Sequence, residues 1–102
     1  MDNKIKAVIV DDEPLARKGL AIRLGAFDTV EVIGQCSSGN MAVEEIPKLK
    51  PDLVFLDIQM PGLNGFQVIN KLSITDNQIC FIYIFCVNIL LSKNEVLHLR
   101  HP

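Results

Sequence analysis

Apolar runs and segments of helical periodicity alternate along residues 5–72. The runs resemble buried strands, being rich in β-branched and aromatic residues, and they span 5–10, Val30–Gly34 and Leu53–Leu56. Each run is followed by apolar residues at helical spacing: Ala16, Leu20, Leu24 and Phe27, then Ala42, Ile46 and Leu49, then Phe66, Val68, Ile69 and Leu72. This order predicts an α/β fold, a doubly wound parallel sheet with right-handed crossovers.

Turn and cap residues predict where these helices begin and end. Pro14 suits the first turn of a helix, with Asp12 or Glu13 placed to cap it, and Gly25 breaks that helix. The segment Ser37-Ser38-Gly39-Asn40 supplies cap candidates for the second helix, which is expected to end between Pro47 and Pro51.

The chain changes character after residue 72. Ile79–Val87 is a candidate fourth buried strand, and the apolar run continues to Leu91 before the sequence turns polar without strand–helix alternation. The whole run is shorter than the ~20 apolar residues of a membrane helix, so no membrane partner is predicted. Because it is uncharged and rich in β-formers, it favours aggregation where it is exposed.

Composition narrows the class of protein. The 102 residues predict one domain, and 49% hydrophobic with 22% charged residues is typical of a globular protein. A net charge of −2 gives no reason to expect nucleic-acid binding by this chain. The polar N-terminus lacks the apolar core of a signal peptide. Cys36, Cys80 and Cys86 are odd in number and lack metal-type spacing, which predicts reduced, apolar filler residues in a cytoplasmic protein.

Acidic residues follow two of the predicted strands. Asp57 lies at the exit of the Leu53–Leu56 run, and Asp11-Asp12-Glu13 follows the first strand. Ligands of open α/β sheets bind where the carboxyl ends of the strands meet the loops. Two strands that deliver carboxylates to one edge therefore predict an acidic pocket suited to a hard cation such as Mg²⁺.

With these residues in place, the chain resembles the receiver domain of two-component response regulators. The resemblance covers residues 4–72 and rests on Val8-Ile9-Val10-Asp11-Asp12-Glu13-Pro14 together with Leu56-Asp57-Ile58-Gln59-Met60-Pro61-Gly62-Leu63-Asn64-Gly65. The segment Asp12-Glu13-Pro14-Leu15-Ala16-Arg17 is most similar to the sequences of LytTR-class regulators. The resemblance implies a single flavodoxin-like receiver domain over 1–102, with a divergent part at 73–102.

Roles for individual residues follow from the resemblance. Asp57 would be the phosphoacceptor, which takes a phosphoryl group from the phosphohistidine of a sensor histidine kinase. The Mg²⁺ ligands would be Asp12, Asp11 partly through water, Asp57, and the backbone carbonyl of Gln59. Gly65, with Pro61-Gly62, would shape the loop beneath the phosphorylation site. A carboxylate that attacks a phosphoryl group needs a cation to offset the gathering negative charge.

Structural roles compete with these assignments. Asp11 and Asp12 could cap the first helix, and Asp12 could both cap and bind metal. Glu13 is interpreted as a first-turn acid that complements the helix dipole.

The last third departs from the receiver pattern. Receivers carry a Ser or Thr at the end of the fourth strand, where this chain has Phe85-Cys86-Val87-Asn88, and a Lys before Pro after a fifth, where Lys93 precedes Asn94. Ser92 and Lys93 are adjacent, so they cannot occupy sites on two strands. The pattern therefore indicates a receiver whose last third is replaced or truncated. The exposed sheet edge that results would favour self-association, and the missing hydroxyl and lysine would impair the switch.

Two other functions stay open at this stage. An aspartyl-nucleophile phosphatase of the haloacid dehalogenase type would place a second Asp two residues after the nucleophile, but that residue is Gln59. A non-phosphorylated interaction module would keep the fold without the switch. LytTR-class regulators also carry a DNA-binding domain for transcription regulation, and none is expected within this chain.

Overall fold

The computed structural model of the chain describes residues 3–73 and 78–84. Strands and helices alternate through this part, as the periodicity predicts. They are β1 (Ile5–Val10), α1 (Pro14–Leu24), β2 (Val30–Cys36), α2 (Gly39–Leu49), β3 (Leu53–Leu56), α3 (Gly65–Leu72) and β4 (Cys80–Tyr83).

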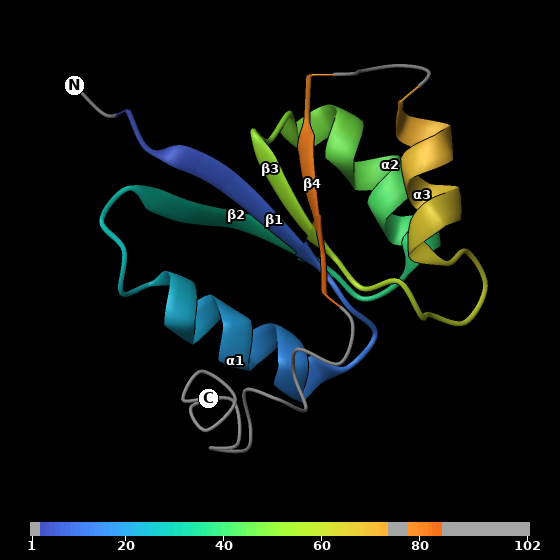
Figure 1. Cartoon of the computed structure of the whole chain (residues 1–102), viewed down its shortest axis with the longest axis horizontal. Coiled ribbons are helices and arrows are strands. Elements are labelled where there is room, and N and C mark those ends of the chain that lie inside the picture. The colour runs from blue at the N-terminus through green and yellow to red at the C-terminus, as the bar shows by residue number, and fades with distance from the viewer. Residues whose placement is uncertain (1–2, 74–77, 85–102) are drawn as a thin grey trace, which may run out of the picture.

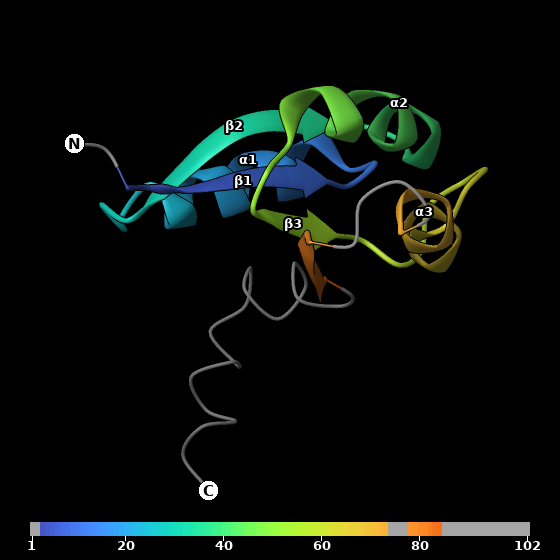
Figure 2. The same cartoon turned by 90° about the horizontal axis from the view of Figure 1, so that it is seen from above.

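The four strands form one parallel sheet in the order β2-β1-β3-β4 (Figure 2). α1 lies on one face of this sheet, while α2 and α3 lie on the other (Figure 1). Parallel strands joined by crossover helices on both faces are the mark of a doubly wound fold. The predicted flavodoxin-like class is therefore confirmed.

The hydrophobic core lies on the face that α2 and α3 cover. Val8, Val10, Val54 and Leu56 point toward these helices and are fully buried. Their helix partners include Ala42, Ile46, Val68 and Leu72, all of which are buried as well. Burying four strand residues against two helices stabilises this side of the domain by removing a large apolar area from water.

The predicted boundaries of the helices hold well. α1 begins at Pro14 and ends before Gly25. Ser38 caps α2 by accepting a hydrogen bond from the Met41 N–H, and α2 ends at Leu49, within the predicted interval. β2 runs two residues beyond the predicted Gly34, because its pairing with β1 continues to Cys36.

Three residues predicted as core or filler are exposed. Phe27 lies beyond the end of α1 and is 58% exposed, and Phe66 in the first turn of α3 is 57% exposed. Cys80 is also exposed, whereas Cys36 is buried as predicted, and both are free thiols. Helical spacing shows which residues share a face, but not how far the neighbouring element extends over them.

β4 is shorter at its start than predicted, because the strand begins at Cys80 and Ile79 precedes it. Its described part ends at Tyr83, and the Ile84 N–H still donates to the Leu56 carbonyl oxygen at 2.7 Å. Cys86, Ser92, Lys93 and the predicted strand end at 85–88 lie outside the described residues. None of the helices that the structure describes is long and apolar enough to cross a membrane.

Candidate functional site

The three predicted aspartates meet at the carboxyl edge of the sheet. Asp11 and Asp12 directly follow β1, and Asp57 directly follows β3. β1 and β3 are neighbours in the sheet although β2 separates them in the chain. This is the point where the strand order reverses, which is where ligands bind in open α/β sheets.

Backbone hydrogen bonds between neighbouring strands set the positions of these aspartates. The Asp57 N–H donates to the Val10 carbonyl oxygen at 2.9 Å, which ties the end of β3 to the end of β1. The Asp11 N–H donates to the Cys36 carbonyl oxygen at 3.1 Å, which extends the pairing of β1 with β2 by one residue. The sheet itself therefore holds Asp11 and Asp57 next to each other.

The three carboxyl groups form a compact acidic cluster. One oxygen atom from each of Asp11, Asp12 and Asp57 lies within 4.8 Å of the other two. Asp11 is only 4% exposed, and Asp57 is half-buried. Three carboxylates at this spacing repel one another, and carboxylate oxygens are the ligands that Mg²⁺ prefers.

The surroundings make two of these carboxyl groups harder to ionise. Burial, followed by the nearby charge of Asp11, raises the pKa of Asp57 to about 6. Burial also raises the pKa of Asp11, although the hydrogen bond from the Glu13 N–H acts in the opposite direction. A cation at the cluster would relieve both the repulsion and the lost hydration, so the donor set fits a divalent metal.

The predicted capping roles at the start of α1 are corrected by the structure. Glu13 is the N-cap residue, but its side chain makes no capping hydrogen bond. Asp11 Oδ1 instead accepts a hydrogen bond from the Glu13 N–H at 2.9 Å. Asp11 therefore closes the turn before the helix by accepting from the N–H two residues later. Pro14, the first residue of the helix, has no N–H that needs a partner.

The loop between β3 and α3 begins at the cluster and is held by backbone contacts. Asp57 Oδ1 accepts a hydrogen bond from the Gln59 N–H at 3.2 Å, and the Gly65 N–H donates to the Ile58 carbonyl oxygen at 2.8 Å. A Cβ at Gly65 would lie 2.8 Å from the Asp57 carbonyl oxygen, so only glycine fits there. The predicted role of Gly65 is confirmed, and metal binding by the Gln59 carbonyl stays a prediction.

One residue at the site escaped the sequence reasoning. The sequence analysis gives Arg17 in α1 no role at the site, yet its Nη1 donates to the Asp11 carbonyl oxygen at 2.6 Å. Long side chains in a helix point back toward its N-terminus, so an arginine in the first turn after an acidic loop can reach that loop. That geometric rule is the signal that could have found it.

Comparisons with known proteins agree with this geometry. The sequence profile described as "Response regulator receiver domain" matches residues 7–91, most of the chain. The chain belongs to the response regulator receiver family. Among curated relatives, the transcriptional regulatory protein BtsR of Salmonella typhi is 47% identical over 68 residues, which are 67% of this chain and 28% of that protein. The response regulator GacA of Pseudomonas syringae is 38% identical over 68 residues, 67% of this chain and 32% of that protein.

Solved receiver structures share the fold. The response regulator domain of Thermotoga maritima CheB is 29% identical and superposes with a TM-score of 0.76 over 80% of this chain and 60% of that one. The signal receiver domain of the putative response regulator NarL from Mycobacterium tuberculosis is 31% identical, with a TM-score of 0.70 over 81% of this chain and 65% of that one. The chain matches less than a third of the length of BtsR, so these comparisons concern a receiver and not a whole regulator.

Proposed function

We propose that this receiver accepts a phosphoryl group on Asp57 from the phosphohistidine of a sensor histidine kinase. The convergence of Asp11, Asp12 and Asp57 within 4.8 Å at the sheet edge is the observation that supports this best. Because the pKa of Asp57 is about 6, its carboxylate is ionised and nucleophilic at neutral pH. A carboxylate oxygen of Asp57 would form a bond to phosphorus while the P–N bond of the donor breaks and its electron pair stays on the imidazole.

Asp12, Asp11, Asp57 and the Gln59 carbonyl are the groups that would hold Mg²⁺. The ion, when bound, offsets the negative charge on the phosphoryl oxygens during transfer. The protein's own part is positioning: β1 and β3 hold the carboxylates together, and the Gln59 N–H orients Asp57 through Oδ1.

Intact mass spectrometry with acetyl phosphate and Mg²⁺ tests the phosphoacceptor role. The wild-type chain should gain the mass of one phosphoryl group, and Asp57→Asn should gain none while keeping its circular dichroism spectrum. Asp52→Asn is the matched control, since Asp52 lies at the opposite end of β3 and should leave the adduct unchanged. A persistent adduct in Asp57→Asn would contradict the assignment.

The metal role has its own test. Calorimetric titration with Mg²⁺ should show clear binding to the wild type and weak binding to Asp12→Asn, which removes one negative ligand. Equal affinity of the two proteins would exclude Asp12 as a ligand.

We further propose that phosphorylation of this chain drives no rearrangement of residues 79–102. A ligand shifts an equilibrium only through contacts that differ between two states. The described strand β4 carries no Ser or Thr, and the residues expected to replace the usual hydroxyl and lysine lie outside the described part. Hydrogen exchange over residues 79–102, with and without beryllofluoride as a phosphoryl mimic, tests this. Strong new protection would show that the tail supplies substitute contacts.

The wider role is a proposal at the level of the whole regulator. The matched relatives include proteins described as transcriptional regulatory proteins, and the segment from Asp12 to Arg17 favours the LytTR class. We therefore propose that this receiver is part of a cytoplasmic transcription regulator. Self-association through β4 is proposed alongside, because this short apolar strand ends the described sheet.

A further inference from the structure

Arg17 contacts the acidic site without being one of its acids. It lies in α1, and its guanidinium reaches back to the turn that joins β1 to α1. The distance of 2.6 Å between Nη1 and the Asp11 carbonyl oxygen makes this a short, charge-assisted hydrogen bond. Arg17 is half-buried, so water competes for this hydrogen bond less than it would for a contact on the surface.

The Asp11 residue is held at three atoms. Its N–H donates to the Cys36 carbonyl oxygen at 3.1 Å, its Oδ1 accepts from the Glu13 N–H at 2.9 Å, and its carbonyl oxygen accepts from Arg17. The first contact fixes Asp11 to β2 and the second closes the turn before Pro14. The Arg17 contact ties the peptide between Asp11 and Asp12 to α1.

This peptide determines where both carboxylates lie. Asp11 and Asp12 are consecutive, so a rotation of the peptide between them would move one carboxylate away from Asp57 or turn the other away from the cluster. The mutual repulsion of the three acids favours such a rotation. A rigid donor from the helix opposes it.

We propose that Arg17 is a positioning residue for the acidic site, whose guanidinium holds the Asp11–Asp12 peptide in the orientation that receives the divalent cation. The inference rests on the proposed metal-binding function and assigns part of it to a residue that binds neither the metal nor the phosphoryl group. Partners of metal ligands commonly contribute in this way, and their loss typically weakens metal binding by roughly 10- to 100-fold.

The main alternative predicts an effect of opposite sign. The charge of Arg17 also favours the ionised form of Asp11, so the comparison is made in buffer alkaline enough to keep Asp11 ionised in every variant. Under that condition, if Arg17 acted only through its charge, it would repel Mg²⁺, and its removal would tighten metal binding. If it positions the ligands, its removal weakens binding even though a repelling charge is lost. The direction of the change therefore separates the two roles.

Calorimetric titration with Mg²⁺ on the wild type, Arg17→Met, Arg17→Lys and Arg23→Met is the experiment. Arg17→Met keeps most of the aliphatic stem and should raise the dissociation constant roughly 10-fold. Arg17→Lys keeps a cationic donor without the planar fork and should fall between it and the wild type. Arg23→Met, in the same helix but exposed and bonded to the Gly19 carbonyl oxygen, should match the wild type.

A second readout separates positioning from loss of fold. The rate of phosphorylation by acetyl phosphate should fall in Arg17→Met at low Mg²⁺ and return to within about twofold of the wild type at saturating Mg²⁺. In metal-free buffer, the Glu13 amide should exchange faster in Arg17→Met, since its acceptor is no longer held.

Each outcome decides the inference. Unchanged or tighter Mg²⁺ binding by Arg17→Met overturns it while leaving the proposed function intact. If the wild type itself binds no Mg²⁺, the proposed metal-binding function and this inference both fail, because there is then no cation site for Arg17 to position. If Arg17→Met does not fold, the same titration and exchange on Arg17→Lys decide.

Discussion

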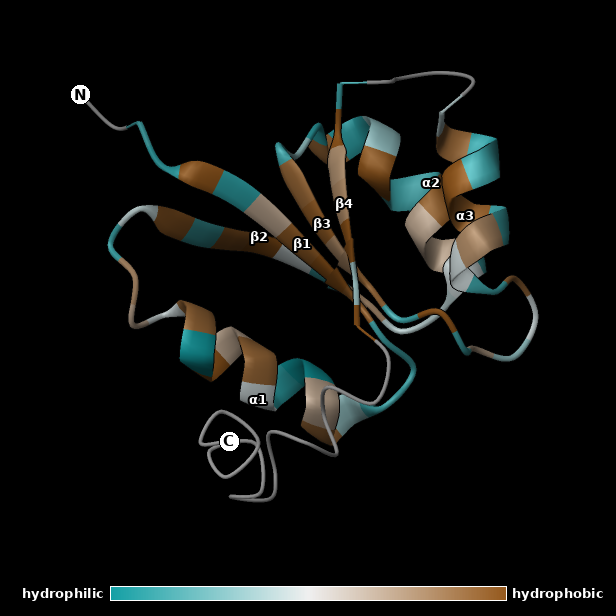
Figure 3. Cartoon of the chain, in the orientation of Figure 1, coloured by the Kyte–Doolittle hydropathy of each residue, from teal (hydrophilic) through white to brown (hydrophobic). Residues whose placement is uncertain are grey.

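Among residues 3–73 and 78–84, the two faces of the sheet differ in how completely the described elements cover them. On the face beneath α2 and α3, the side chains of Val54 and Leu56 in β3 are fully buried. On the opposite face α1 packs against β1 and β2, and there Ile9 is fully buried. Farther along this second face, Phe55 of β3 is half-buried and Ile82 of β4 is 43% exposed. Hydropathy colouring shows that most residues of β3 and β4 are apolar (Figure 3).

The contrast follows the order of elements in the chain. The covered face is built from strand–helix units in which each helix lies beside the strands it must bury. The open face lies where regular alternation ends in the sequence, after residue 72. The acidic site lies at the ends of β1 and β3, so the part of the domain with regular strand–helix alternation forms it.

The largest test of this contrast compares two isoleucines in two helices. Ile46 in α2 is fully buried on the covered face, whereas Ile22 in α1 is 66% exposed. Ile46→Ala should lower the free energy of unfolding by about 2–5 kcal/mol, because it leaves a cavity in the core. Ile22→Ala should change it by no more than about 0.5 kcal/mol. Urea denaturation measures both, and similar losses would contradict the exposure of Ile22.

The same contrast explains which sequence predictions succeeded. The strands, the start of α1 at Pro14 and the Ser38 cap were predictable, because local periodicity and turn chemistry agree with the fold there. Asp11, Asp12 and Asp57 could be placed together because parallel strands deliver their carboxyl ends to one edge. Exposure of Phe27 and Phe66 was not predictable, since it depends on how far the neighbouring elements extend.

Other features depended on contacts between distant segments. The last two residues of β2 are strand because β1 supplies partners for them, and nothing in their own sequence indicates it. The contact between Arg17 and Asp11 depends on the direction in which a helical side chain leans. Both features lie outside what periodicity alone can predict.

The acidic site adds a pH dependence that neither apolar face supplies. The pKa of Asp57 is raised from 3.8 to about 6, so the folded state binds a proton more tightly than the unfolded chain. Its stabilising contribution is complete below the unfolded pKa and is lost as pH rises through about 6. As the pH rises from about 4.5 to about 7.5, the free energy of unfolding of Asp57→Asn should therefore increase relative to that of the wild type. The increase should be about 1–2 kcal/mol after solvent screening.

Urea denaturation at both pH values in metal-free buffer measures that gain. Mg²⁺ at the higher pH should reduce it, because the ion stabilises only the folded wild type. Asp52→Asn, at the exposed residue just before β3, serves as the control and should track the wild type. Parallel curves for Asp57→Asn and the wild type would contradict the raised pKa.

The open face should also govern association between copies of the chain. Ile82→Lys places a charge on that face in the last described strand, as charged residues do on natural edge strands. We expect the dissociation constant for self-association to rise roughly fivefold, about 1 kcal/mol. Asn70→Lys makes the same charge change on the exposed side of α3 and should have no effect. Sedimentation over a range of concentrations measures both; equal association of the two variants would place the contact elsewhere.

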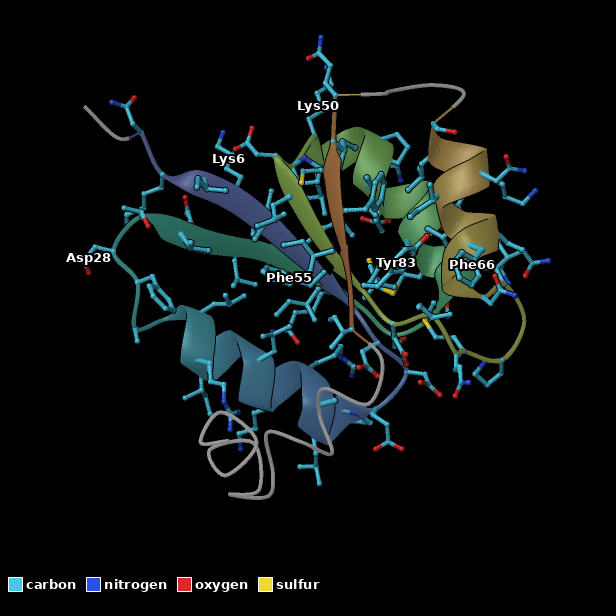
Figure 4. The ribbon with its side chains drawn as sticks, in the orientation of Figure 1. Lys6, Asp28, Lys50, Phe55, Phe66 and Tyr83 are labelled. Atoms are coloured by element: carbon cyan, nitrogen blue, oxygen red, sulfur yellow. The ribbon has the colours of Figure 1, made fainter. Side chains whose placement is uncertain are left out.

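The smallest expected effect concerns an aromatic pair at the rim of the covered face. The rings of Phe66 and Tyr83 lie 5.2 Å apart between centroids with an interplanar angle of 59°. Figure 4 shows that Tyr83 is directed toward Phe66, whereas Phe55 lies on the other side of the sheet. The pairing of Leu56 with Tyr83 requires this arrangement. Tilted pairs at this distance contribute about 0.5–1.5 kcal/mol beyond area burial, and these two rings are partly exposed.

A double-mutant cycle with Phe66→Leu and Tyr83→Leu should therefore give a coupling energy near the lower limit, about 0.5 kcal/mol. The matched cycle combines Phe66→Leu with Phe55→Leu, and it should give a coupling close to zero because the sheet separates these two rings. Urea denaturation of the single and double variants provides both values. Equal coupling energies in the two cycles would mean that side chains on opposite faces of β3 interact energetically. The two faces would then differ in solvent exposure but not in how strongly their side chains couple to Phe66.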